Sequence, residues 1–458
     1  MGQNDSALEK RLIRKLDFFI VAYCCLCYFL NYLDRNALAN AYVAGMKESL
    51  NLKQNDYSSL LSIFTAGLLT GNIPHALILQ KVQPRIWIPT TVLVWSGLTM
   101  ACAGCHNFAQ IATVRFLQGW FEGSLYCGAI FIVGSCKADE ISVRTSIFTS
   151  VGQVGSMFAG IMMTAMRTSM DGHRGMEGWR WVFIVDGLMG VPVGIFGLLF
   201  LPNTPKSTKM PYLSKEEIEL AISRMPPVAR DSKKINPRSL AKRVLKTPNI
   251  YILTAFSIFS AMTEGCFLLW MRHYQDKYSK AAVNTYPLGI QAVAIVSMIV
   301  AGAYVDRTKN YVVVGIVSGL LQMLSGAMLV VPSLPDAGTF FAMYLSGTSF
   351  VVNPLLYGWG GVITRRNGDE AARAVTLYTM STGGLLLYTF WGIVLYPASD
   401  APYWKKGAIT LMVAVLGFWT ILYWVNWLDK RTQKLLEDKE AEVDVVVSET
   451  QVIETKVA

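Results

Sequence analysis

Charged residues are scarce in this sequence. Asp, Glu, Lys and Arg make up 16% of the 458 residues, whereas 53% are hydrophobic and the mean hydropathy is positive. A soluble protein of this length usually carries about 25% charged residues. Apolar windows long enough to cross a bilayer as a helix recur down the whole chain, separated by short polar connections. The composition therefore argues against an ordinary soluble protein and indicates a multi-pass membrane protein.

We expect no cleaved leader, no disulfide framework and no cofactor from this sequence. The first apolar run continues into Asp34 and Arg35 instead of ending at small residues, so we expect it to be the first membrane helix. The eight cysteines lie almost entirely within apolar windows, which argues against extracellular disulfides. The stretch from Cys102 to His106 has the spacing of a c-type haem site, but it closes an apolar helix, and we interpret it as coincidence. With no nucleophile, metal or nucleotide motif, we expect no enzyme, no metal and no cofactor.

The apolar windows divide into two groups of six around one long basic connection, residues 202–246. This predicts an all-α membrane protein of twelve transmembrane helices in two six-helix halves, a common transporter architecture. The predicted parts are a cytoplasmic N-terminus at 1–16, the halves at 17–201 and 247–428, the cytoplasmic linker between them, and a cytoplasmic tail at 429–458. The windows are 17–38, 57–79, 85–105, 108–134, 145–166, 181–201, 249–272, 285–305, 311–331, 338–362, 373–396 and 405–427.

Lys and Arg are unevenly distributed across these windows. Of the 41, 29 fall on the side that holds both termini, 10 fall on the other side, and Arg35 and Arg115 are expected inside the membrane. Basic residues favour the cytoplasmic side, so both termini are expected there. The net charge of +10 follows from this bias, and nucleic-acid binding is not expected.

The linker and the tail carry further local signals. Within the linker, Ser214 precedes a helical pattern and Glu217 follows three residues later, which predicts a short surface helix with a capping box. After Leu428 the chain is rich in charge, and we expect it to be disordered beyond a first helical turn or two.

A few ionisable residues lie inside the windows, where a charge needs a partner or a watery cavity. Arg35 is interpreted either as a fork-shaped cation for a substrate carboxylate or as the structural partner of a carboxylate such as Glu122. Glu122 is interpreted as a proton-carrying acid or as the counter-ion of Arg115, which lies on the same helix face seven residues earlier. Asp34 is a second protonatable group or an anchor of the first helix, and neighbouring helix positions predict that it and Arg35 reach different partners. The others are Asp186, interpreted as structural, and Glu264, which is left open.

Uncharged and boundary residues add to the expected site. Asn31, one turn before Arg35, is expected to orient it and to contact substrate, and Asn353, before Pro354, lies where the tenth helix can break. Between the eighth and ninth helices, Asp306 and Arg307 are expected to act in gating. The corresponding connection between the second and third helices has no Asp.

Four segments together resemble the anion:cation symporter family of the major facilitator superfamily, with greatest likeness to fungal permeases for pantothenate, biotin, allantoate and nicotinate. They are YLDRNALANAYVAGMKESLNL, RFLQGWFEGSLYCGAIFIVGS, GWRWVFIVDG and LPNTPKSTKMPYLSKEE, and the likeness spans residues 12–430. The resemblance implies a central site and proton-driven uptake of organic anions. It assigns proton coupling and anion binding to Asp34, Arg35 and Glu122, with Arg115 as a charge partner. The sequence departs from many relatives at Cys127, where they have Pro, and at Asp186, where they have Glu.

Together with the ionisable residues in the windows, this resemblance implies a monomeric plasma-membrane symporter for protons and a small monocarboxylate, with pantothenate as the leading candidate. The alternatives are a proton-antiport exporter and a non-transporting sensor. The fifth helix has the glycines of an antiporter motif but lacks its proline, which favours import over export.

Overall fold

The computed structural model describes residues 3–53, 56–125, 128, 141–203, 210–223, 237–261, 286, 288–331, 334–366, 369–395 and 405–457. In these residues the chain is helical with short connections and contains no strand. Eight of the helices are long and apolar enough to cross a membrane. The other predicted spans correspond to α5, α6, α12 and α19, of which α6, α12 and α19 end at or near segments outside the described residues. The predicted all-α membrane fold is confirmed.

The first half begins with one long helical rod. It is formed by α1 (Gln3–Leu16), the π-helical turn η1 (Asp17–Val21) and α2 (Ala22–Ala41), which join without leaving helical backbone angles. A second π-helical turn, η2 (Tyr42–Met46), contains Gly45 at a φ of 120°, an angle that glycine adopts readily, and leads into α3 (Lys47–Ser49). The remaining helices of this half are α4 (Asp56–Lys81), α5 (Pro84–Cys102), α6 (Phe108–Glu122), α8 (Ile141–Ser169) and α9 (Gly178–Phe200).

Close backbone contact joins α4 to α6. A Cβ on Gly67 would lie 2.2 Å from the Phe116 carbonyl oxygen, and a Cβ on Gly119 would lie 2.2 Å from that of Phe64. Small residues at both positions allow the two helices to touch, a common packing mode in membranes. This contact fixes the helix face that carries Arg115 and Glu122.

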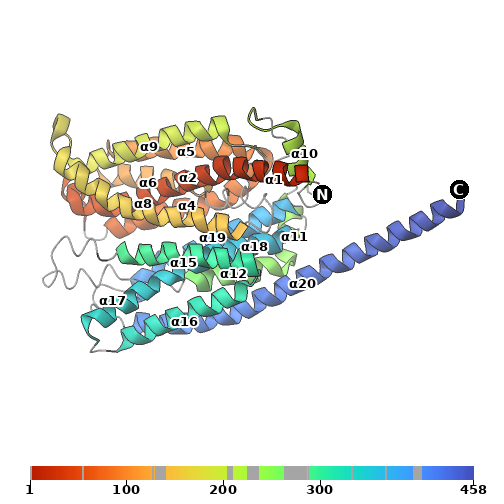
Figure 1. Ribbon diagram of the computed structural model, residues 1–458. Coiled ribbons are helices and arrows are strands. Elements are labelled where there is room, and N and C mark those ends of the chain that lie inside the picture. The colour runs from red at the N-terminus through yellow and green to blue at the C-terminus, as the bar shows by residue number, and fades with distance from the viewer. Residues whose placement is uncertain are drawn as a thin grey trace.

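The second half contains α12 (Pro248–Ala261), α15 (Leu288–Thr308), α16 (Tyr311–Val330), α19 (Glu370–Leu395) and α20 (Lys405–Val457). Its tenth span is divided into α17 (Asp336–Leu345), the 3-10 segment η7 (Ser346–Val351) and α18 (Val352–Arg365). The expected disorder of the tail is corrected, because α20 continues as helix to Val457 and extends away from the bundle (Figure 1). The tail has neither Gly nor Pro and is rich in Glu and Lys, which favour helix.

Polar side chains of α16 support the irregular segment η7. A 3-10 turn leaves carbonyl groups without α-helical partners. The Gln322 amide donates to the carbonyls of Leu345 and Ser346 at 3.3 and 3.2 Å, and the Ser325 hydroxyl donates to Ala342 at 2.7 Å. The break predicted in the tenth helix therefore lies just before Asn353 and is held by the neighbouring helix.

The linker contains α10 (Lys215–Ser223) and α11 (Pro237–Lys246). The predicted capping box is confirmed, because Glu217 N donates to Ser214 Oγ at 3.2 Å and Ser214 N donates to Glu217 Oε2 at 2.8 Å. Lys15 of α1 donates to the Glu217 carboxylate at 2.7 Å and to the Tyr212 carbonyl at 2.6 Å. Burial by itself raises the pKa of Glu217, but these hydrogen bonds lower the pKa by more, to below its usual value. The linker is thus docked on the N-terminal helix.

The two halves meet mainly where α4 packs against α19 and where α8 packs against α15 and α18. Side-chain hydrogen bonds also join the two halves in several pairs. The N-terminus, α10 and α11 lie together at one end of the bundle (Figure 1). We call this the basic end. The pairs are Asn72 with Thr382, Tyr378 with Ser124, Ser142 with Tyr311, Val143 with Asp306, and Thr149 with Met298.

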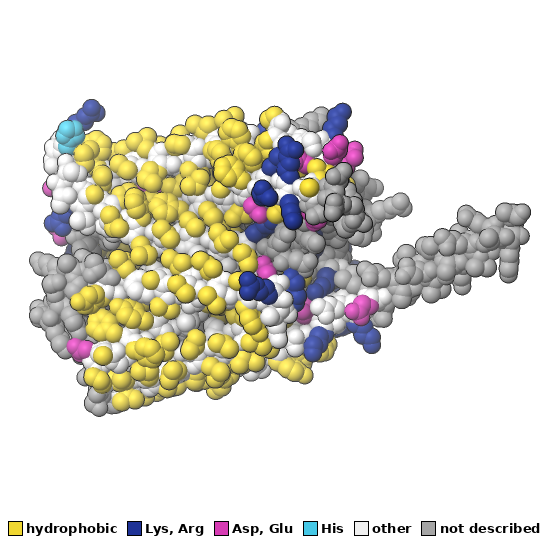
Figure 2. All heavy atoms as spheres, in the orientation of Figure 1, with side chains coloured by type: hydrophobic (Ala, Val, Ile, Leu, Met, Phe, Trp, Pro, Cys, Tyr) yellow, Lys and Arg dark blue, Asp and Glu magenta, His cyan; other side chains and the backbone are white. Residues whose placement is uncertain are grey.

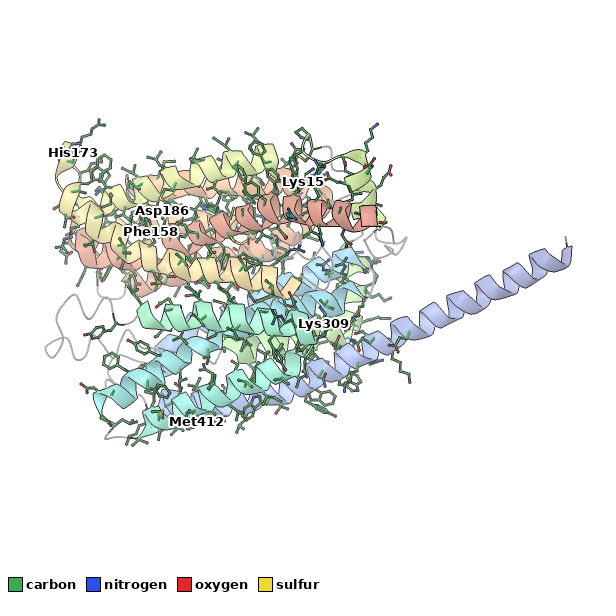
Figure 3. The ribbon with its side chains drawn as sticks, in the orientation of Figure 1. Lys15, Phe158, His173, Asp186, Lys309 and Met412 are labelled. Atoms are coloured by element: carbon green, nitrogen blue, oxygen red, sulfur yellow. The ribbon has the colours of Figure 1, made fainter. Side chains whose placement is uncertain are left out.

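The surface of the bundle differs in composition between its sides and its ends. Hydrophobic side chains cover the visible flank, and Lys and Arg gather at the basic end (Figure 2). Lys15 and Lys309 lie toward this end, whereas His173 lies at the opposite end, which we call the distal end (Figure 3). This is the distribution expected of a protein embedded in a bilayer.

Candidate functional site

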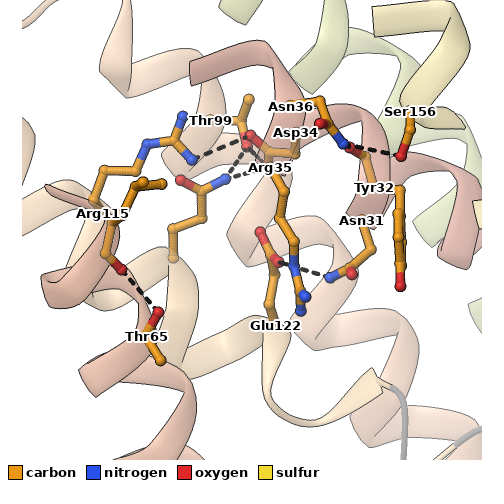
Figure 4. A network of polar contacts seen from close by, with 12 residues as sticks. Asn31, Tyr32, Asp34, Arg35, Asn36, Thr65, Thr99, Arg115, Glu122 and Ser156 are labelled. Atoms are coloured by element: carbon orange, nitrogen blue, oxygen red, sulfur yellow. Dashed lines mark hydrogen bonds and ion pairs between the residues drawn. The ribbon is translucent and has the colours of Figure 1, made fainter. Parts of the chain in front are cut away.

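The two adjacent charges on α2 point in different directions. Asp34 is buried, with 2% of its side chain exposed, whereas Arg35 keeps 36% of its side chain exposed. Successive helical residues diverge by about 100°, so the difference follows from the helix itself. As predicted from the spacing, the two residues reach different partners (Figure 4).

Asp34 joins α2 to α5 and α6. Its Oδ2 accepts hydrogen bonds from Thr99 Oγ1 at 2.6 Å and from Gln118 Nε2. Its Oδ1 lies 3.7 Å from Nη1 of Arg115, whose side chain is 1% exposed and stacks over the Phe183 ring at 5.3 Å. The buried Arg115 cation and the buried Asp34 carboxylate compensate each other's charge. In this geometry Asp34 acts as an anchor that joins the first membrane helix to its neighbours.

Arg35 pairs with a carboxylate from α6. Its Nε lies 3.7 Å from Oε2 of Glu122, whose side chain is fully buried. This separation exceeds the 2.7–2.9 Å of a charge-assisted hydrogen bond, so the contact is electrostatic. The guanidinium also lies over the rings of Tyr32 and Phe64, with centroid distances of 5.8 and 5.6 Å. Arg35 is therefore a loosely paired cation between two aromatic rings.

Glu122 has a second partner on α2. Asn31 Nδ2 donates to Glu122 Oε2 at 2.6 Å, and Oε1 has no hydrogen-bond partner among the described residues. The expectation that Asn31 orients Arg35 is therefore corrected: within the described part of the chain its amide orients Glu122. The geometry also corrects the suggested Arg115–Glu122 pair, because the described ion pair of Arg115 is with Asp34. The two carboxyl groups, of Asp34 and Glu122, lie within electrostatic range of each other.

Residues that the sequence did not single out complete the network. Gln118 lies on α6 between Arg115 and Glu122, at a spacing that places all three on one face, and it bonds both Asp34 and Thr99. The spacing of Gln118 from Arg115 and Glu122 could have identified it from the sequence as a member of the network. Thr99 is one of four Ser and Thr residues on α5, and nothing in its spacing distinguished it from the others.

Two other expected site residues lie outside this network. The side chain of Asn353 lies outside the described residues. Asp306 accepts a hydrogen bond from the backbone N–H of Val143 at 2.9 Å and thereby caps the N-terminus of α8 in the other half. A carboxylate at a helix N-terminus is favoured by the helix dipole. Arg307 is exposed at the basic end.

His75 contributes to the packing of three helices. Trp87 Nε1 donates to its Nδ1 at 3.0 Å, and its Nε2 lies 2.7 Å from the Trp120 carbonyl, where it acts as the donor. Both ring nitrogens are therefore used in tying α4 to α5 and α6. In the described ranges no group of three or more His, Cys, Asp or Glu side chains is placed to hold a metal ion.

Comparisons with known proteins agree on the family. The family model described as Major Facilitator Superfamily matches residues 24–387. The chain is 32% identical to the pantothenate transporter liz1 of Schizosaccharomyces pombe over 98% of the chain and 88% of the relative. It is 31% identical to the pantothenate transporter FEN2 of Saccharomyces cerevisiae over 90% of the chain and 82% of the relative. The solved structure of the proton:xylose symporter XylE matches with a TM-score of 0.64 at 14% identity, over 88% of the chain and 95% of that protein, which shows a common fold.

Proposed function

The chain belongs to the major facilitator superfamily, and on this premise we propose that it imports a small organic monocarboxylate, such as pantothenate, together with protons. At the coarser level, it is a multi-pass membrane transporter of a small organic substrate and not an enzyme. The observation that carries the finer proposal is the pair formed by Arg35, a partly exposed guanidinium, and Glu122, a fully buried carboxylate.

A substrate carboxylate competes with Glu122 for Arg35. The guanidinium has a fork of donors that fits a carboxylate with two parallel hydrogen bonds, whereas its present contact is a single approach at 3.7 Å. An incoming carboxylate therefore makes better contacts than Glu122 does. Tyr32 and Phe64, which flank the guanidinium, offer surfaces for the body of the substrate.

Displacement of Glu122 couples this exchange to a proton. A buried carboxylate that loses its cation is strongly destabilised, by about 3–5 kcal/mol for a fully buried pair. Protonation removes that charge. Substrate and proton consequently bind together, which is the thermodynamic requirement for symport.

The Asp306 cap supports alternating access. Because it joins the end of α15 to the start of α8 across the two halves, it stabilises the form in which the basic end is closed. Opening that end requires the cap to break, and we assign gating to Asp306 on this basis. Arg307, beside it, adds positive charge at the same surface.

The relatives' names and the site charge support the substrate class. Both reported relatives are named as pantothenate transporters. In the described part of the network Arg35 is the partly exposed cation, which suits one carboxylate, and amide groups such as those of Asn31 and Asn353 suit an amide-bearing body. The bias of Lys and Arg toward the basic end supports a cytoplasmic location for both termini. Import across the plasma membrane by a monomer is a further part of the proposal.

The test is uptake of radiolabelled pantothenate by cells that lack their own permease, at acidic and neutral external pH. Uptake should exceed that of cells without the protein, rise on acidification, and be reduced by unlabelled pantothenate, biotin and nicotinate more than by citrate or glucose. Accumulation below the background identifies an exporter, and an unchanged background identifies a non-transporting protein. Preferential competition by citrate or glucose refutes the monocarboxylate class.

A further inference from the structure

Helix α11, at the end of the linker, carries charge of one sign and leads directly into a membrane span. Its sequence, PRSLAKRVLK, includes four Lys or Arg and no Asp or Glu. Only Thr247 separates it from α12, which corresponds to the seventh predicted span. Figure 1 shows α11 at the basic end of the bundle. The helix therefore lies where one surface of the bilayer is expected.

One face of α11 is fixed to the bundle. Leu240 and Val244, four residues apart, are buried in a cluster with residues of α4 and α19. Arg243 Nη1 lies 2.8 Å from Asp369 Oδ2. Asp369 Oδ1 also accepts a hydrogen bond from Ala372 N at 3.0 Å, so the same carboxylate caps the start of α19 and holds α11. These contacts determine which face of α11 turns outward.

The outward face carries a basic stripe formed by Arg238, Lys242 and Lys246. The three residues are exposed, and their spacing of four places them along one side of the helix. At about 100° per residue, the centre of this stripe lies about 180° from the midpoint between Leu240 and Val244. The basic stripe therefore faces away from the bundle.

An apolar and an aromatic side chain border the basic stripe. Leu245 is 56% exposed, and Tyr251, in the first turn of α12, is 58% exposed. The Tyr251 hydroxyl donates to the Leu245 carbonyl at 3.0 Å and thereby joins the last turn of α11 to the start of the span. Tyrosine is enriched at the headgroup level of a bilayer, where its ring meets the apolar part and its hydroxyl meets the polar part. These contacts place the stripe at headgroup depth.

We propose that the basic stripe of α11 binds the headgroups of anionic phospholipids in the adjoining leaflet. Lys and Arg beside a membrane span attract such headgroups, and each contributes about a fivefold preference for anionic over neutral lipid. A soluble anion would use only the cations, whereas a phospholipid also meets the exposed Leu245 and Tyr251. This interaction surface is separate from the Arg35–Glu122 site and does not depend on the identity of the substrate.

The experiment measures which lipids contact α11 in the full-length protein. The protein is reconstituted in phosphatidylcholine bilayers that contain a trace of photoactivatable phosphatidylserine or, in parallel, of photoactivatable phosphatidylcholine, each with its reactive group near the headgroup. After irradiation, mass spectrometry quantifies crosslinks within residues 238–251. Three cations acting fully predict about a hundredfold more labelling by phosphatidylserine. The excess should shrink in about 1 M salt, where the Debye length is about 3 Å. Equal labelling by the two lipids, or an excess that does not respond to salt, overturns the proposal.

Variants assign the lipid preference to the basic stripe. Lys242→Gln/Lys246→Gln removes two charges without changing the face that packs on α19, and it should lower the ratio of phosphatidylserine to phosphatidylcholine labelling by about 25-fold. Lys242→Gln alone should lower the ratio by about fivefold. Lys405→Gln/Lys406→Gln removes the same charge from exposed positions at the start of α20, at the distal end, and should keep the wild-type ratio. An unchanged ratio in the α11 variants, or an equal fall in the α20 control, refutes the assignment. Because no step uses pantothenate, the outcome is independent of the proposed function.

Discussion

Replacing Arg35 by alanine removes the cation on which substrate binding depends. The guanidinium now approaches Glu122 at 3.7 Å, a contact with a gross Coulomb energy of about 4 kcal/mol at an effective dielectric constant of about 20. Partial exposure of Arg35 reduces the net value. A substrate carboxylate bound by both arms of the fork makes two charge-assisted hydrogen bonds, and truncating one partner of such a pair costs about 2–5 kcal/mol. We expect Arg35→Ala to raise the pantothenate concentration needed for half-maximal uptake by about a hundredfold or more.

The assay is concentration-dependent uptake at a fixed acidic pH, with surface expression measured in parallel. Arg35→Lys keeps the charge but loses the planar fork, so an intermediate loss of about tenfold is expected. Arg167→Ala, at an exposed position near the distal end of α8, is the matched control and should behave as wild type. Near-normal affinity in a well-expressed Arg35→Ala protein would remove this residue from the site.

Three further predictions follow from named contacts. In Glu122→Gln the side chain occupies the same space without titrating, so substrate exchange should persist while pH-driven accumulation is lost. Glu219→Gln, at an exposed position on α10, serves as the control. If Glu122→Gln responded to acid as the wild-type protein does, the transported proton would be carried elsewhere. Asp306→Asn weakens the cap on α8 by about 1 kcal/mol and should therefore make the basic end open more often. A cysteine introduced at Ser146, which is buried beside Gly302, should then react about fivefold faster with a thiol reagent supplied at the basic end. An unchanged rate would contradict a role of Asp306 in gating. The pKa of Glu217 in the folded protein lies below its unfolded value of about 4.3. The bond from Lys15 to Glu217 therefore stabilises docking of the linker fully above that pH, and this stabilisation is lost as the pH falls below it. If the protease sensitivity of residues 210–223 did not change across this pH range, the contribution of the bond would be refuted.

Local patterns predicted local structure well. Hydropathy located the spans because a bilayer sets the length of an apolar helix. The capping box at Ser214 and Glu217 was predictable because both partners lie within one helical turn. Helical spacing also predicted that Asp34 and Arg35 diverge and that Arg115 and Glu122 share a face.

Contacts between helices were harder to predict. The sequence pattern of one helix does not reveal how far it is shifted or rotated against its neighbours, so the choice of Arg115 for Asp34, and of Asn31 for Glu122, required the structure. The support that Gln322 gives to η7 likewise depends on the relative height of two helices. Thr99 had no local signal because its role exists only through its partner.

The most direct test of the exchange between substrate and Glu122 is the accumulation of radiolabelled pantothenate in proteoliposomes, measured against an imposed pH difference at zero membrane potential. Accumulation by the wild-type protein should rise about tenfold for each pH unit, and Glu122→Gln should leave pantothenate at equilibrium with the outside at every pH difference. A wild-type protein that exchanges pantothenate rapidly but never concentrates it in response to pH would contradict the account.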